Sequence, residues 1–92
     1  NNPPPVGGSG NCMANGASAS SITGNHEHSL TVSMDDVNAG TAKTYSILGG
    51  ASHGHNVTVS VANFNTLRTN NQITLISTQG DDHTHNVTIS CA

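Results

Sequence analysis

The sequence predicts an all-β domain, a small antiparallel β-sandwich or barrel built from three hairpin-like repeats. Val, Ile and Thr alternate with polar residues along much of the chain, which is typical of strands. Clusters of Gly, Asn, Asp and Ser separate these runs and predict turns. A His-x-His motif followed by an alternating run occurs three times, beginning at residues 26, 53 and 83. Repetition at this interval indicates an internally repeated structural unit.

The composition favours a single ordered domain and excludes two classes of partner. The chain has 92 residues, of which 33% are hydrophobic and 8% charged, with a net charge of −3. Two Lys/Arg residues give no basic surface for nucleic acid or anionic lipid. No apolar run approaches the length of a membrane span. We therefore expect neither a nucleic-acid partner nor a membrane span.

The first eleven residues differ from the rest and predict an N-terminal arm (1–11) ahead of a β domain (12–92). Pro3, Pro4 and Pro5 favour polyproline II, and the glycines that follow favour flexibility. Two interpretations stay open for this arm. It is either a disordered leader or a segment that docks on a neighbouring molecule.

Each of the three repeats joins a β-like run to a strand that begins with His-x-His. Short connections separate the repeats, and we expect them to form helical turns that cover the core. The paired segments are 17–25 with 26–34, 41–52 with 53–62, and 72–82 with 83–92, and the connections are 35–40 and 63–71.

The alternation of side chains places the imidazoles on the buried face. Successive side chains of a strand point to opposite faces. In the second repeat His53 and His55 share a face with Val57, Val59 and Val61. Because equivalent strands start at the same end of a core, we expect all the histidines to meet at one pole. The same pattern places Met34, Val61 and Cys91 on the buried face at the other end of their strands.

These histidines are the candidate metal ligands, and they include every histidine of the chain. Neighbouring imidazoles cannot all be protonated, and polar groups at the edge of a core need partners, so a transition-metal ion is the simplest common partner. Imidazole suits copper, zinc, nickel and iron, and copper, which heads the affinity order, is our first expectation. A hydrogen-bonded histidine ladder and separately metallated surface pairs are the alternatives. The predicted ligands are His26, His28, His53, His55, His83 and His85.

Acidic residues near the motifs are candidates for an outer shell around the site. Glu27, Asp81 and Asp82 lie within or just before a histidine pair and could accept hydrogen bonds from imidazole N–H groups. Asp81 and Asp82 follow Gly80, and we expect them rather to be ordinary turn residues.

The two cysteines predict a disulfide. Cys12 and Cys91 lie near opposite ends of the chain. A bridge between them would close nearly the whole domain, which is worth about 4–5 kcal/mol in the chain-entropy model. The chain starts with Asn1 rather than Met, so we expect a processed, secreted form in an extracellular or periplasmic compartment.

Three functions remain open at this point. The first is a secreted protein that binds a transition metal through its histidine pairs, alone or as a self-assembling fibre subunit. The second is a purely structural filament subunit, a homo-oligomer that polymerises by strand addition of the arm 1–11. The third is a zinc-dependent hydrolytic enzyme. We do not expect an enzyme, because Glu27, the acid inside a histidine pair, points to the opposite face.

The segments "HEHSLTVS", "DVNAGTAKTYSI", "HGHNVTVS" and "HTHNVTISCA" resemble small secreted bacterial proteins that carry HxH repeats and have no established function. This likeness spans residues 12–92. The HxH element alone is also similar to the iron-binding motif of phage long-tail-fibre tips, where three chains each contribute one pair to an octahedral ion. Here one chain carries three pairs, so the second resemblance covers only the histidines and implies nothing about topology.

Overall fold

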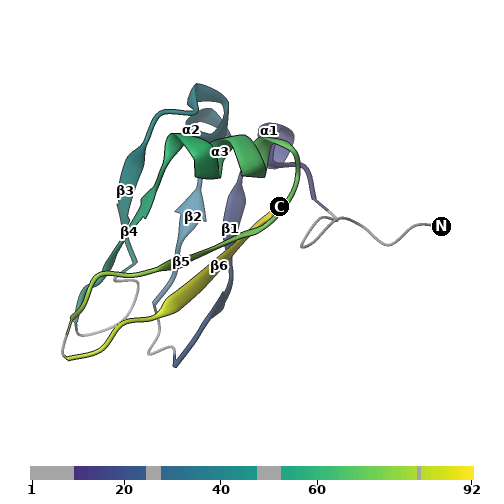
Figure 1. The fold of residues 1–92 in the computed structure, drawn as a ribbon. Helices are drawn as coiled ribbons and strands as arrows, with labels where there is room; N and C mark the ends of the chain where they lie inside the picture. The colour runs from purple at the N-terminus through teal and green to yellow at the C-terminus, as the bar shows by residue number, and fades with distance from the viewer. Residues whose placement is uncertain (1–9, 25–27, 48–52, 81) are drawn as a thin grey trace.

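Short helices and strands alternate along the chain in the computed structural model, which describes residues 10–24, 28–47, 53–80 and 82–92. Figure 1 shows the helices together at one end of the molecule and the strands running away from them. The elements are α1 (Cys12–Asn15), β1 (Ala17–Ile22), β2 (Thr31–Val32), α2 (Met34–Ala39), β3 (Lys43–Ser46), β4 (Asn56–Val59), α3 (Val61–Arg68), β5 (Ile73–Ile76) and β6 (Asn86–Cys91).

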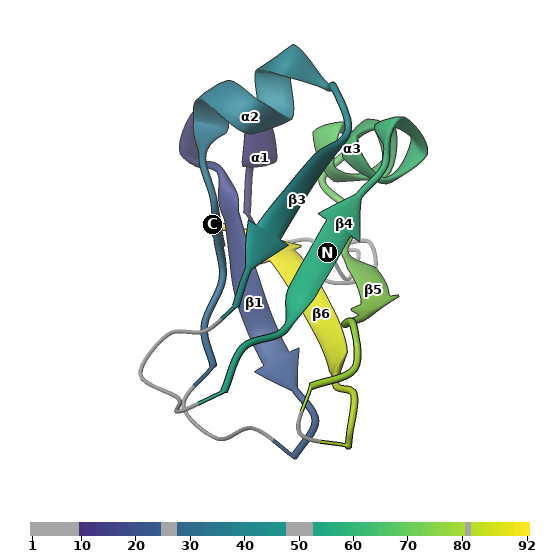
Figure 2. The ribbon, with the colours of Figure 1, turned by 90° about the vertical axis from the view of Figure 1, so that its left-hand side faces the viewer.

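The strands form two antiparallel sheets. A four-stranded sheet has the order β2-β1-β6-β5, and β3 pairs with β4 in a separate two-stranded sheet. Figure 2 shows β3 and β4 in front of β1 and β6. The prediction of an antiparallel, mainly β domain is therefore confirmed in outline. The two sheets, one four-stranded and one two-stranded, with helices at one end (Figure 1), are not clearly the expected three-hairpin sandwich or barrel.

The order of elements reveals what each sequence repeat contains. A helix precedes each consecutive pair of strands, which gives the units α1-β1-β2, α2-β3-β4 and α3-β5-β6. The two strands of each unit pair with each other in antiparallel fashion. The expected helical turns at 35–40 and 63–71 correspond to α2 and α3. Helix α1 had no counterpart among the predictions, because its four residues are too few for a periodic pattern.

Each helix begins at a polar residue that caps it. The side chains of Asn11, Ser33 and Ser60 each accept a hydrogen bond from the backbone N–H three residues later. Ser33 and Ser60 thereby end the preceding strand. The expectation that Met34 and Val61 lie on the buried face was wrong, since they start helices and are 45% and 52% exposed.

The hydrophobic core lies beneath the helices. Val37 of α2 and Phe64 and Leu67 of α3 are fully buried there. Alternate residues of β4 and β6 face them, as the strand pattern predicted. Burial of each such side chain contributes about 1.5–3 kcal/mol. The strand residues of this core include Val32, Val57, Val59, Val87 and Ile89.

A disulfide joins Cys12 to Cys91, with Cα atoms 4.6 Å apart, and the Asn11 N–H donates to the Ala92 carbonyl at 2.8 Å. In the first two units the second strand runs through a capping serine directly into the next helix. The third unit ends at the corresponding place, beside the start of α1. The backbone thus joins unit one to unit two and unit two to unit three, and the disulfide joins unit three to unit one.

Replacing both cysteines (Cys12→Ala with Cys91→Ala) should lower the free energy of unfolding by about 4 kcal/mol, because the bridge closes a long loop in the unfolded chain. Urea denaturation followed by circular dichroism measures this change. Met13→Ala, at an exposed neighbour of Cys12, is the control and should change little. Equal stability of the cysteine-free and parent proteins would contradict the proposed role of the bridge.

Candidate metal centre

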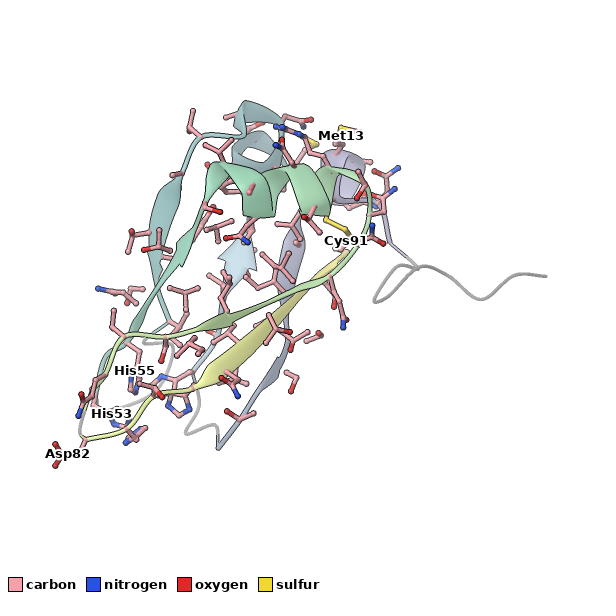
Figure 3. The ribbon with its side chains drawn as sticks, viewed as in Figure 1. Met13, His53, His55, Asp82 and Cys91 are labelled. Atoms are coloured by element: carbon pink, nitrogen blue, oxygen red, sulfur yellow. A yellow bond between two sulfur atoms is a disulfide. The ribbon has the colours of Figure 1, made fainter. Side chains whose placement is uncertain are left out.

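Histidines of all three units reach the pole opposite the helices. Figure 3 shows His53 and His55 at the end of the molecule remote from Cys91. We call His28, His55 and His85 the inner histidines, because they are buried at 4%, 1% and 2% exposure. His53 and His83, which are half-buried, are the outer histidines. His26, the third outer position of the repeat, lies outside the described residues.

The described histidines face a common centre. Each of the five offers one ligand nitrogen, and these atoms all lie within 4.8 Å of one another. The ring centroids of the inner histidines form a nearly equilateral triangle with sides of 4.5, 4.6 and 4.8 Å. The Nε2 atoms of the two outer histidines, His53 and His83, lie within hydrogen-bonding distance of each other, at 3.1 Å. The predicted convergence of imidazoles at one pole is therefore confirmed for these five.

The inner histidines are oriented by backbone carbonyls. A carbonyl oxygen only accepts, so the Nδ1 atom of each inner ring carries a proton, and in the neutral ring the Nε2 atom carries the lone pair. The Nε2 atom of His55 is buried and has no hydrogen-bond partner among the described residues. The Nδ1–H groups donate to Ile47 from His28 (2.9 Å), to Thr78 from His55 (2.7 Å) and to Thr23 from His85 (2.6 Å).

Each accepting carbonyl belongs to the next unit in a cycle. Unit one donates to unit two, unit two to unit three, and unit three back to unit one. The residue after each inner histidine repeats this link through backbone hydrogen bonds. The links are Ser29 N–H to Ile47 O (3.3 Å), Thr78 N–H to Asn56 O (2.8 Å) and Thr23 N–H to Asn86 O (3.0 Å). The two sheets are thus tied into a closed ring at the histidine pole.

The outer-shell groups differ from those that the sequence suggested. Glu27 and Asp81 lie outside the described residues. Asp82 is exposed and has a φ of 64°, as suits a turn residue. The acceptors are main-chain carbonyls, which no residue type marks. The hydroxyls of Thr23 and Thr78, which accept from the N–H groups after His85 and His55, were the available signal and were missed.

The donor set is chemically uniform. The described cluster consists of imidazoles alone, and both cysteines of the chain are taken up by the disulfide. Neutral imidazole suits copper, zinc, nickel and iron, whereas magnesium and calcium prefer oxygen ligands. Donation of the second ring N–H to a carbonyl is also the arrangement found around metal-binding histidines. The arrangement could therefore hold a transition-metal ion.

Comparisons with known proteins found no relative from which a function could be carried over. No protein-family model matches the chain, and neither the curated proteins nor the solved structures gave a significant match. Among the described residues, no helix has the length and apolar character needed to cross a membrane.

In the metal-free protein at neutral pH, the inner histidines should carry their proton on Nδ1, because a carbonyl accepts from each of these atoms. Two-bond ¹H–¹⁵N correlation NMR distinguishes the two tautomers of neutral imidazole. His55 is the most informative ring, since its Nε2 atom has no hydrogen-bond partner among the described residues. An Nε2–H tautomer at His55 would contradict the assigned orientation.

Proposed function

We propose that this protein binds one transition-metal ion in the histidine cluster. The observation that carries the proposal is the set of five ligand nitrogens within 4.8 Å of one another. A hydrogen-bonded ladder of imidazoles would need donors and acceptors in alternation. Instead, the inner histidines donate their Nδ1 protons to backbone carbonyls rather than to each other, and the ligand nitrogens of the five rings lie close together.

The ion would link the three units of the domain. Its ligands come from all three units, at the pole opposite the disulfide, so metal binding and folding are linked. Copper has the highest general affinity for nitrogen ligands, and zinc, nickel and iron accept the same ligands. By the repeat, His26 is proposed as a further ligand beside the five described ones.

The proposed setting is extracellular or periplasmic. The disulfide between Cys12 and Cys91 is compatible with an oxidising compartment, where such bridges persist. A domain with a small core has little stability of its own, and a disulfide and a bound metal ion would both add to it.

Metal addition should raise the stability of the purified protein, by about 2.7 kcal/mol at a free metal concentration of 100 times the Kd. Elemental analysis gives the bound ion, and thermal unfolding before and after addition of copper or zinc gives the shift. His53→Ala with His83→Ala should lose most of the shift. Thr84→Ala, on the exposed face between His83 and His85, should keep it. Only trace metal in every preparation, with no shift, would contradict the proposal.

Assembly into a filament is a second proposal, favoured by a different observation. Strand β5 lies at the edge of the four-stranded sheet, and its residue Ile76 is 70% exposed. An exposed apolar residue on an edge strand is typical of a strand that accepts another. The arm 1–11 of a neighbouring copy is the proposed added strand, although its residues 1–9 lie outside the described part.

Deletion of residues 1–11 should convert filaments to monomers, because it removes the proposed added strand. The substitution Ile76→Lys should do the same, because a charge on the edge strand blocks strand pairing. Electron microscopy and light scattering measure this. Met13→Lys, at an exposed apolar residue outside the sheets, is the matched control and should leave assembly intact. A parent protein that is monomeric at all concentrations would end this second proposal without affecting the metal site.

A further inference from the structure

The five described rings have an unequal pattern of neighbours. His55 lies beside all four others, with ring centroids 4.5 to 5.1 Å apart. The others form a closed cycle, His28–His53–His83–His85, whose sides are 5.0, 4.8, 4.8 and 4.6 Å. Among the described rings, no close ring contact joins the pairs across the cycle, His28 with His83 and His53 with His85.

An octahedron produces this pattern when five of its six corners are occupied. One corner is then adjacent to the other four, and those four form a square with two opposite pairs. His55 takes the first role, and the cycle takes the second. A trigonal bipyramid has a single opposite pair, and a tetrahedron has none and only four corners.

The distances agree with the same geometry. With metal–nitrogen bonds of about 2.0–2.1 Å, adjacent nitrogens of an octahedron are about 2.9 Å apart and opposite ones about 4.1 Å. The Nε2 atoms of the adjacent residues His53 and His83 are 3.1 Å apart, and no ligand pair exceeds 4.8 Å. A ring centroid lies about 3.2 Å from such an ion, so adjacent centroids should be about 4.5 Å apart. The observed separations are 4.5 to 5.1 Å.

We infer that the site selects a six-coordinate divalent ion of the iron(II), cobalt(II) or nickel(II) class, held at five corners by His28, His53, His55, His83 and His85. This inference rests on the proposed function and specifies its ion. Zinc, which is nearly always four-coordinate in structural sites, would leave imidazoles unused. Copper has the greater general affinity, but geometry decides selectivity at a site that the protein has shaped.

The parent protein provides the first test. The metal-free chain is titrated with Co²⁺, whose visible absorption is weak when six-coordinate and strong when tetrahedral, and X-ray absorption counts the imidazoles around bound Ni²⁺. Weak bands and at least five imidazoles support the inference. Binding with strong tetrahedral bands, or with four imidazoles or fewer, overturns it and leaves the proposed function standing. Failure to bind any of Fe²⁺, Co²⁺, Ni²⁺, copper or zinc overturns the proposed function and this inference together.

A matched pair of double variants tests which residues are opposite. His28→Ala with His83→Ala leaves His53 opposite His85, with His55 between them, which are three corners of a square plane. His28→Ala with His53→Ala leaves His55, His83 and His85, which are mutually adjacent. Both lack the buried His28 and differ only in the outer histidine removed. Circular dichroism checks that both remain folded.

Cu²⁺ prefers ligands in a square plane, so the first variant should bind it about tenfold more tightly or better. It should also give the more axial electron paramagnetic resonance spectrum. Equal affinities, or tighter binding by the second variant, would overturn the assignment of opposite pairs. The measurements on the parent protein do not depend on either variant folding.

Discussion

The hydrogen bond from an inner histidine Nδ1–H to a carbonyl of the next unit is the interaction on which the site depends. It fixes the ring plane, chooses the tautomer and aims the Nε2 lone pair at the centre. The bonds of His28 and His55 also join units that are separate in the sheets, since β3 and β4 do not pair with the four-stranded sheet. The three bonds, from His28, His55 and His85, form a cycle. Loss of one histidine leaves its carbonyl acceptor without this bond, and the backbone hydrogen bond alone then joins the two units.

The three units are linked to one another at both ends of the molecule, by different chemistry at each end. At the helical end, the backbone joins one unit to the next twice, and the disulfide makes the third connection. At the histidine end, the hydrogen-bonded cycle ties the units together, and the proposed ion would link them again. A domain of this size has a small core, so links at both ends offset the entropy of ordering the long loops between strands. Val37, Phe64 and Leu67 of the helices are buried in the core beneath the helical end.

The alternation of residue types predicted which histidines are buried, but it did not predict the main-chain hydrogen bonds or the division into two sheets. Alternation placed His28, His55 and His85 on the buried face beside Val57 and Val87, as the structure has them. The same rule failed at Met34 and Val61, since a capping serine ends the strand one residue earlier and alternation no longer applies. The acceptors could not be predicted, because a main-chain carbonyl has no residue type. The separation of β3 and β4 from the other strands depends on long-range pairing, which period-two patterns do not specify.

The number of repeats sets the number of ligands. A His-x-His strand offers two rings on one face, about 6.5–7 Å apart along the chain, so each unit supplies an inner and an outer position. Two units would provide four positions, enough for a tetrahedral or planar site. Three units provide six positions, as many as the corners of an octahedron. The structure describes five of them, the three inner histidines and the outer histidines His53 and His83. The proposed six-coordinate geometry would therefore follow from three repeats that each supply two histidines.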